Sequence, residues 1–516
     1  MARPIAAAAP TEGDRRLFWG CFVALVATSF GFIVRAMVIG EWATAFGLTE
    51  TQKGEIFGVG LWPFAVSIVL FSLVIDRIGY GRAMGFAFAC HVASAFLTIY
   101  ATGYQSLYVA TFIGALANGT VEAVINPVVA TVFSREKTKW LNILHAGWPG
   151  GLVLGGLMAL ALGPETRWTY KVALVLIPAA LYGLLLLGRS FPVHERVAAG
   201  VSYRDMLKEA GWLGALVVVA LIVFEVAGRF GATLTQKLAL TGLLTAVYGV
   251  YVVSPGRAMF VVLLLIMIPL ATTELGTDSW ITDLVAPEMS KLGLQAGWVL
   301  VYTSFIMMVL RFCAGPIVHR LSPLGLLCAC SAIAAIGLVA LSRSSGLAIL
   351  VAATLYGVGK TFFWPTMLGV VAERFPRGGA LTLNATGGVG MLGVGVVGAV
   401  LLGNIQDKHI ESDLLEWDRE HRSALHATYV GEPKPSIFGE YRALDAAKVA
   451  SAPAADKATI DQVTSQAKKG ALETVALFPV VMLVCYLALL AWFRARGGYQ
   501  AVQLGGEEPG SGRATG

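Results

Sequence analysis

Two ionisable side chains occupy matching places in two apolar stretches of this sequence. Glu122 lies in the string from Gly119 to Pro127, and Lys360 lies in the similar string from Gly357 to Pro365. An ionised group inside a bilayer is costly and is a functional candidate by default. A carboxyl in such a place can take up and release a proton, and a nearby amine can pair with it. We interpret Glu122 and Lys360 as a proton-coupling pair in a site between two related halves.

Glu122 belongs to a polar stripe. Asn118, Glu122 and Asn126 recur at every fourth position, so they share one face of a helix. That face must contact protein or water, because lipid cannot satisfy polar groups. In the functional interpretation, Glu122 carries the proton and the two amides bind substrate hydroxyls. In the competing interpretation, Glu122 and Lys360 form a permanent salt bridge that holds the halves together.

The C-terminal half offers a second set of polar and aromatic side chains. Trp364 lies one turn from Lys360, where it can stack on the apolar face of a sugar ring or serve as core packing. Glu274 and Asp278 are also one turn apart, although Asp278 alternatively lies at a solvated helix end. We expect these C-terminal side chains to bind substrate: Glu274, Thr277, Asp278, Trp280, Trp364 and Asn384.

Three more polar side chains lie in apolar stretches of the N-terminal half. Arg35 is well inside the first stretch, where it either clamps an anionic substrate or neutralises a buried acid. Asn142 and His145 are three positions apart and extend the hydrogen-bond network of the site. His145 either relays protons or is a satisfied structural group.

A charged string, Asp76-Arg77 and Arg82, follows the second apolar stretch. We expect these side chains to lie at the inner mouth of the molecule, where pairs between the halves would close an inner gate. The competing interpretation is that the arginines only anchor the chain at the inner surface.

The composition indicates a membrane protein. Of the 516 residues, 56% are hydrophobic and only 14% are charged, so too little polar surface exists to cover a water-soluble globule. The net charge of +6 does not indicate a nucleic-acid partner, because the basic residues cluster in short loops. The six cysteines lie in apolar stretches without metal-site spacing, so we expect no disulfide, metal or cofactor.

The apolar stretches predict an all-α polytopic fold of 14 spans, with two six-helix bundles related by a pseudo-two-fold axis plus two inserted helices. Basic loops place both termini in the cytoplasm and the chain in the inner membrane. The predicted parts are a cytoplasmic tail (1–16), an N-terminal bundle (17–190), a linker with an amphipathic segment and the inserted pair (191–256), C-terminal helices seven to eleven (257–403), an extracytoplasmic loop (404–470), the last core helix (471–496) and a cytoplasmic tail (497–516).

These motifs resemble the major facilitator superfamily. Gly54 and the string from Ile75 to Arg82 are similar to the superfamily's loop motif, with Ser72 where a glycine is usual. Gly119-x-x-Glu-x-x-x-Asn-Pro127, followed by Leu141-Asn142, resembles the fucose–proton symporters. That resemblance implies that Glu122 is a protonation site. Arg35 stands in the span where that branch has a second acid.

We expect proton-coupled uptake of a small polyhydroxylated solute, a sugar or a sugar acid, by alternating access. Its partners would be protons, the solute and the lipid bilayer, and we expect a monomer. Arg35 and Lys360 keep open the export or exchange of an organic anion by the same fold. A non-transporting membrane receptor that signals through residues 404–470 is a third hypothesis. No nucleophile–base pair or phosphate loop indicates an enzyme.

Overall fold

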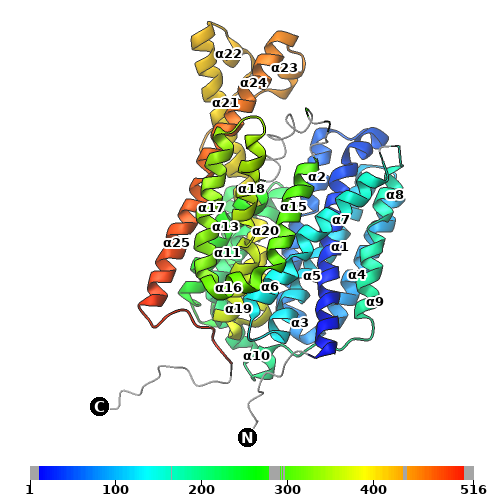
Figure 1. Ribbon diagram of the computed structural model, residues 1–516, viewed down its shortest axis with the longest axis vertical. Coiled ribbons are helices and arrows are strands. Elements are labelled where there is room, and N and C mark those ends of the chain that lie inside the picture. Colours follow the sequence, from blue (N-terminus) through cyan, green and yellow to red (C-terminus); the bar gives the residue numbers. More distant parts are fainter. Residues whose placement is uncertain are drawn as a thin grey trace.

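The computed structural model describes residues 11–163, 165–277, 291, 293, 297–433 and 439–504. These residues are helical apart from turns, loops and one isolated bridge between Val430 and Leu444. The long helices stand side by side in one bundle, and a smaller group of helices projects from one end of it (Figure 1). The prediction of an all-α polytopic fold is therefore confirmed.

Six spans form the N-terminal half. Three of these spans are broken near a glycine or a proline. Each broken span consists of two consecutive helices. The helices of this half are α1 (Glu12–Phe46), α2 (Glu50–Val59), α3 (Trp62–Ile78), α4 (Tyr80–Ile99), α5 (Tyr104–Val132), α6 (Lys137–His145), α7 (Gly147–Ala161), α8 (Trp168–Ala173) and α9 (Leu176–Leu186).

A linker with two further helices follows. It contains the short α10 (Glu195–Ala198), then α11 (Tyr203–Arg229) and α12 (Leu234–Val252), which pack against each other. Gly211 bends α11 with φ +60°, and a Cβ there would collide with the backbone of Gly256. The amphipathic segment predicted from the sequence is thus the first two turns of α11.

The C-terminal half repeats the broken-helix pattern. Its helices are α13 (Ala258–Ala271), the π-helix η1 (Thr272–Gly276), α15 (Gly297–Phe312), α16 (Ala314–Leu321), α17 (Pro323–Arg343), α18 (Ala348–Lys360), α19 (Phe363–Arg374), the 3-10 turn η2 (Pro376–Gly378), α20 (Gly379–Gly393), the π-helix η3 (Val394–Gly398), α21 (Ala399–His421), α24 (Ala454–Val475) and α25 (Leu477–Arg494). Between α21 and α24 lie α22 (Leu425–Tyr429) and α23 (Ala446–Ala450).

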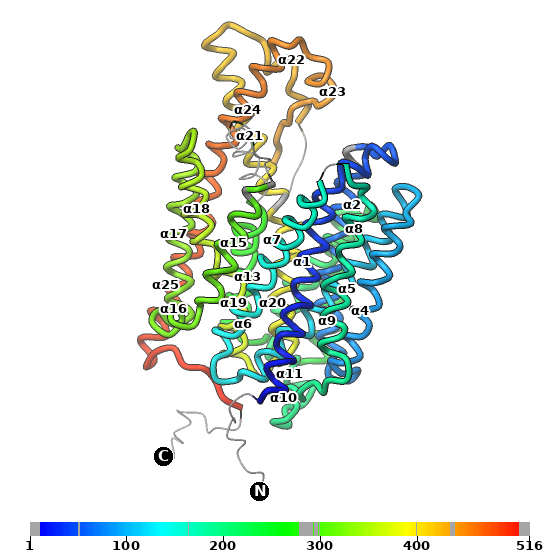
Figure 2. Tube along the Cα trace, turned by 45° about the vertical axis from the view of Figure 1, so that its right-hand side comes forward, coloured from blue at the N-terminus to red at the C-terminus, as the bar shows by residue number. Residues whose placement is uncertain are grey.

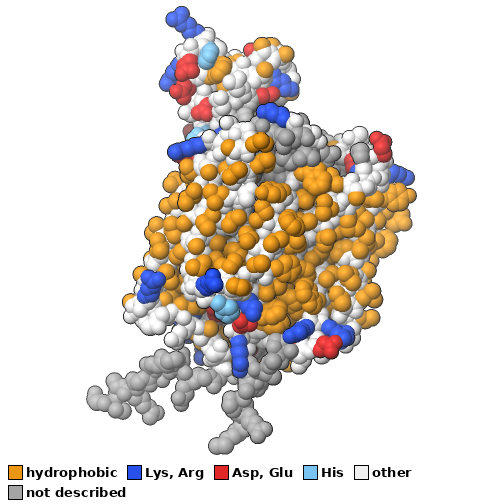
Figure 3. Space-filling view, in the orientation of Figure 1, with side chains coloured by type: hydrophobic (Ala, Val, Ile, Leu, Met, Phe, Trp, Pro, Cys, Tyr) orange, Lys and Arg blue, Asp and Glu red, His pale blue; other side chains and the backbone are white. Residues whose placement is uncertain are grey.

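Within the described residues, 12 helices are long and apolar enough to cross a membrane, and the bent pair α15–α16 raises this number to 13. The inserted helix α12 is not among them, because Gln236 and Lys237 in its first turn make it more polar. The predicted total of 14 spans is therefore not established. Hydrophobic side chains cover the middle of the visible face, and charged ones gather at its two ends (Figure 3).

The segment predicted as an extracytoplasmic loop is largely helical. The helix α21 continues outward from the bundle, and α24 returns to it, so that α21 to α24 form a projecting subdomain (Figure 2). The subdomain has its own apolar core, which includes Leu414 and Ile460. Arg343 at the end of α17 binds Glu473 at 2.7 Å and ties the base of α24 to the bundle.

The two halves contact each other through small residues. On α19, Gly369 lies against Thr138 of α6, and a Cβ there would come within 2.7 Å of the Thr138 Cα. On α20, Gly388 lies against Val69 of α3 in the same way. Larger side chains at these places would separate the halves. The α6–α19 contact lies toward the end of the bundle where α10 is found, called the α10 side below (Figure 1).

Candidate functional site

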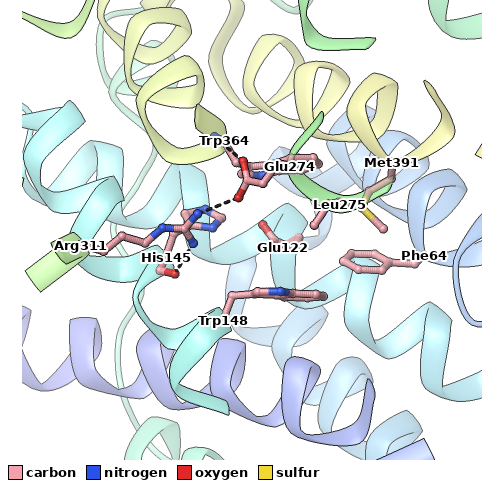
Figure 4. A pocket seen from close by; sticks show the side chains of 9 residues that line it. All are labelled: Phe64, Glu122, His145, Trp148, Glu274, Leu275, Arg311, Trp364 and Met391. Carbon is pink, nitrogen blue, oxygen red and sulfur yellow. Dashed lines mark hydrogen bonds and ion pairs between the residues drawn. The ribbon is translucent and has the colours of Figure 1, made fainter. Parts of the chain in front are cut away.

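A central cavity lies between the two halves and contains Glu122. The cavity offers about 30 Å³ to the centre of a water molecule, which is room for water but not for a sugar. Its lining residues come from both halves (Figure 4): Phe64, Glu122, His145, Trp148, Glu274, Leu275, Arg311, Trp364 and Met391. Figure 4 shows Glu122 among these side chains, with the guanidinium of Arg311 directed toward Glu274.

Glu122 is bound by a neutral amide. Asn126 Nδ2 donates to Glu122 Oε2 at 2.6 Å, as expected for residues one turn apart on α5. Asn126 Oδ1 in turn accepts from Nε2 of His145 at 2.9 Å. Because Oδ1 can only accept, this nitrogen carries the proton of the imidazole. Within the described residues Glu122 forms no ion pair, although only 5% of its surface is exposed.

Glu274, in contrast to Glu122, is bound by a positively charged side chain. Arg311 Nη2 donates to Glu274 Oε1 at 2.7 Å, and the backbone N–H of Trp364 donates to Oε2 at 2.9 Å. Arg311 also donates to the carbonyl oxygens of Thr361, at 2.7 Å, and His145, at 2.8 Å. The last bond crosses from α15 to α6 and joins the halves at the cavity. The carboxylate of Glu274 is therefore neutralised by a buried guanidinium, each of whose three nitrogen atoms donates a hydrogen bond.

Lys360 lies beside Glu274. Its Nζ donates to the Glu274 carbonyl oxygen at 3.1 Å and lies 5.6 Å from the centre of the Tyr356 ring. The expected contact between Lys360 and Glu122 is not formed in this conformation. The alternative in which these two residues make a permanent salt bridge is therefore wrong for the conformation described.

The predicted asparagines have different surroundings. Asn126 reaches the cavity network, whereas Asn118 Oδ1 pairs with His91 Nε2 at 2.8 Å inside the N-terminal half. Asn142 Nδ2 donates to Thr366 Oγ1 at 3.2 Å, and Asn384 Nδ2 donates to the Ala123 carbonyl oxygen at 3.0 Å. The latter two bonds join the halves instead of lining the cavity.

Of the other C-terminal residues predicted to bind substrate, some lie at the central cavity and some do not. Trp364 lines the central cavity. Thr277 Oγ1 is 2.7 Å from Tyr356 Oη and is buried beside the cavity. Asp278 and Trp280 lie outside the described residues.

Arg35 does not reach the central cavity. It lines a second cavity, called the N-terminal cavity below, together with Trp42, His91 and Asn118. All lining residues of this cavity belong to the N-terminal half.

The predicted gating residues lie on the α10 side, but their partners belong to the linker. Asp76 forms an ion pair with Arg196 of α10. The Arg77 guanidinium lies 5.3 Å from the centre of the Tyr203 ring, and Arg82 is exposed at the rim of a surface pocket. The expected ion pairs between the two halves are thus replaced by contacts with α10 and α11.

Other residues close the α10 side. Lys137 Nζ donates to the Ala372 carbonyl oxygen at 3.2 Å, and the Thr138 N–H donates to Glu373 Oε1 at the same distance. Both bonds join α6 to α19. His194 is buried next to this contact, and burial, with Lys137 and Arg196 nearby, lowers the pKa of His194 from 6.5 to about 3.

Sequence reasoning missed Arg311, the cation of the central cavity. A signal was present, because Arg311 lies in the apolar run Val301–Phe312 and the rule that selected Glu122 applies equally to it. Trp148, Phe64 and Met391 were also missed, because aromatic and thioether side chains in an apolar helix do not distinguish a cavity lining from ordinary packing.

Comparisons with known proteins agree on the fold. A family model described as Major Facilitator Superfamily matches residues 20–400. The E. coli fucose:proton symporter FucP is 12% identical, with a TM-score of 0.56 over 90% of this chain and 98% of that one. The proton:xylose symporter XylE is 13% identical, with a TM-score of 0.60 over 92% and 95%. The human organic anion transporter MFSD10 is 13% identical, with a TM-score of 0.58 over 92% and 99%.

Among curated proteins, a TsgA homolog of Buchnera aphidicola is 22% identical over 182 residues. The match covers 35% of this chain and 47% of that protein, so the chain spans about half the length of this relative. At these identities the structural likenesses show the fold alone.

Proposed function

Because the chain belongs to the Major Facilitator Superfamily, a family of secondary transporters and not of enzymes, we propose that it couples proton entry to the uptake of a small polyhydroxylated solute. The solute would be a sugar or a sugar acid. Transport would proceed by alternating access, with the central cavity opening to each side of the membrane in turn.

One observation carries this proposal, namely the unequal treatment of two carboxylates in one cavity. Glu274 is bound by Arg311 at 2.7 Å, whereas the one hydrogen bond that Glu122 receives from a described side chain comes from the neutral amide of Asn126. A carboxylate that is locked to a guanidinium keeps its charge. A buried carboxyl that is hydrogen-bonded to a neutral amide, with the guanidinium of Arg311 in the same cavity but not bonded to it, can exchange a proton without breaking a direct ion pair. Glu122 is therefore the proton carrier, and Glu274 is part of the fixed charge of the site.

Protonation of Glu122 has a path to the contact between the halves. Glu122, Asn126 and His145 form a chain of hydrogen bonds, and the backbone carbonyl of His145 accepts from Arg311 of the other half. When Glu122 takes up a proton, the charge at the start of this chain disappears. The chain rearranges, and the bond between His145 and Arg311 is weakened. This sequence would allow the loaded carrier to reorient.

The lining of the cavity suits a ring with hydroxyl groups. Trp148 and Trp364 come from opposite halves and offer apolar faces for stacking, and Glu122 and His145 supply polar contacts. The cavity must widen before a solute enters, since it has room only for water in this conformation. The fold likeness to a fucose:proton symporter and a proton:xylose symporter supports the same solute class.

The positions of the first and last long helices support an orientation of the chain in the membrane. The helix α1 begins on the α10 side, and α25 ends there; in Figure 1 this is the lower end of the bundle. We assign this side to the cytoplasm of an inner membrane, in agreement with the basic loops. A single chain supplies both walls of the cavity, so a monomer is sufficient for the cycle.

A second function in the same family is the transport of an organic anion. Arg311 lines the cavity and Lys360 lies next to it, so a carboxylate on the solute would meet two cations. MFSD10, whose fold is similar, is an organic anion transporter. A sugar acid and another organic anion would both place a carboxylate beside these cations. Transport of a neutral sugar would therefore distinguish sugar uptake from organic-anion transport.

Uptake into proteoliposomes tests the proposal. An inward proton gradient should drive accumulation of one member of a panel of labelled sugars, sugar acids and dicarboxylates. Glu122→Gln should abolish accumulation while leaving exchange of the same solute across the membrane. Glu473→Gln, the same change in the exposed pair with Arg343, is the matched control and should behave as the wild type. Accumulation by Glu122→Gln at the wild-type level would refute the role of Glu122.

A further inference from the structure

The N-terminal cavity is a second internal space, separate from the central one. It lies among α1, α4, α5 and α8, and it offers about 50 Å³ to the centre of a water molecule. Its polar lining includes Arg35, Trp42, His91, Ser94 and Asn118. None of these residues lines the central cavity. The mechanism proposed above gives none of these residues a role. Asn118 is nevertheless close to the proton carrier in the chain, one turn from Glu122 on α5.

Arg35 brings a charge to this cavity that no residue described here compensates. The guanidinium is permanently charged, and within the described chain it makes no hydrogen bond or ion pair. No aspartate or glutamate is among the residues that line the cavity. Arg35 lies inside the span of α1, and its Nη1 comes so close to Gly60 that a side chain at that glycine would collide with it. Arg35 is only partly exposed, so an anion beside it would lower the cost of placing this charge inside the span.

Two neutral donors accompany the guanidinium. The indole N–H of Trp42 has no acceptor in the described part of the chain, although Trp42 is only 2% exposed. The orientation of Asn118 follows from His91, whose Nε2 must donate to the Asn118 Oδ1 at 2.8 Å, while its Nδ1 accepts from Tyr182 Oη at 2.9 Å. This pairing leaves the Asn118 amide nitrogen, a donor, available to the cavity.

Two hydroxyl groups of the lining already donate to backbone carbonyl oxygens. Ser94 Oγ donates to the Ala110 carbonyl oxygen at 2.7 Å, and Thr98 Oγ1 donates to the Ser94 carbonyl oxygen at 2.8 Å. Their hydrogens are already used. Among the described lining residues, the donors that remain for an occupant are the guanidinium of Arg35, the indole N–H of Trp42, the amide of Asn118 and the hydroxyl of Thr111.

We propose that the N-terminal cavity binds a small monovalent anion of the size of chloride, held by Arg35, Trp42 and Asn118. The anion supplies the counter-charge that the chain lacks. It bridges α1 to α5 and so steadies the helix face that carries Glu122. The site lies inside one bundle, so the anion is a resident ligand and does not pass through the central cavity. The inference is independent of the nature of the transported solute.

A chloride titration of the purified protein in detergent tests this site. Sodium gluconate is replaced by sodium chloride at constant ionic strength, and the unfolding temperature is followed. The wild type should show a saturable rise of about 3 °C, because a ligand that binds only the folded state raises its stability. Arg35→Gln should abolish the rise.

Trp42→Phe keeps the ring but removes the N–H, so it remains informative if Arg35→Gln fails to fold. It should raise the half-saturating chloride concentration about tenfold, the cost of one hydrogen bond to an anion. Trp19→Phe is the matched control, since Trp19 is an exposed tryptophan of the same helix and should leave the titration unchanged. A wild type without saturable chloride dependence, as expected for a cavity that holds only water, would overturn the proposal. Equal curves for Trp42→Phe and the wild type would do the same.

Discussion

Arg311 on α15 and Glu274 on η1 form the buried ion pair of the central cavity, with Nη2 2.7 Å from Oε1. The side chains of both residues are almost completely enclosed. The same guanidinium reaches the carbonyl oxygen of His145 in the other half. The pair therefore belongs at once to the charge balance of the cavity and to the contact between the halves.

Removing one partner of this pair should greatly reduce the stability of the folded protein. Arg311→Gln removes the only described cation that is hydrogen-bonded to the Glu274 carboxylate and leaves Lys360, which binds the Glu274 backbone carbonyl, as the nearby positive charge. The broken buried pair should cost about 3–5 kcal/mol of stability. Thermal unfolding in detergent measures the loss, and transport should disappear with it. The control is Arg343→Gln, which breaks an exposed pair with Glu473 and should cost at most about 1 kcal/mol. Similar losses in the two variants would contradict the assigned role of Arg311.

The position of the Trp364 indole should depend on Gly390, which lies against it. A Cβ at Gly390 would come within 2.7 Å of both Trp364 Cζ3 and Met267 Cε, so we expect Gly390→Ala to displace the indole, which lines the central cavity. We expect the KM for the transported solute to rise about tenfold, equivalent to roughly 1.4 kcal/mol. Gly387→Ala on the same helix is the control, because its Cβ would meet Trp364 at an ordinary 3.8 Å. An unchanged KM in Gly390→Ala would show that Trp364 does not contact the solute.

The close contact of Gly369 with Thr138 should keep the α10 side closed. In Gly369→Val the new side chain meets the Thr138 backbone, which cannot move aside without separating α6 from α19. Spin labels at the exposed positions Arg82 and Arg320, one in each half, should lie farther apart in this variant. Gly54→Val, where nothing lies within 4 Å, should leave the distance unchanged. If both variants give the wild-type distance, Gly369 is not part of the closure.

The linker at His194 should lose stability in acid. Burial lowers the pKa of His194 from 6.5 to about 3, so the unfolded chain binds more protons than the folded one between these values. The contribution to stability is therefore complete above pH 6.5 and decreases as the pH falls toward 3. Unfolding temperatures measured from pH 8 to pH 4 should decrease less in His194→Asn than in the wild type.

Asparagine retains an acceptor for the Arg196 N–H, which His194 Nδ1 accepts at 3.0 Å, so this variant tests protonation and not the hydrogen bond. His421→Asn, at an exposed position of the subdomain, is the control. Parallel curves for the wild type and His194→Asn would exclude the buried histidine as the source of the acid sensitivity.

Hydropathy and helical spacing alone determined the membrane class, the all-helical fold and the place of Glu122. Apolar stretches of bilayer length must be helices, because no other single segment satisfies its backbone in lipid. A polar stripe at every fourth residue must face the interior of such a bundle, and the structure places Glu122 in the cavity between the halves. These properties depend on neighbours within one helix, which the chain order itself specifies.

The partners of the charged groups were decided only by the tertiary structure. The spacing of Glu274 shows which face of its helix is polar, but not that Arg311 of α15 lies opposite it while Lys360 reaches its carbonyl oxygen. In the same way Arg35 and Glu122 both looked like residues of one site, yet they line different cavities. Periodicity fixes directions around each helix axis. Which faces meet depends on the rotation and tilt of each helix, and packing across the whole bundle determines these.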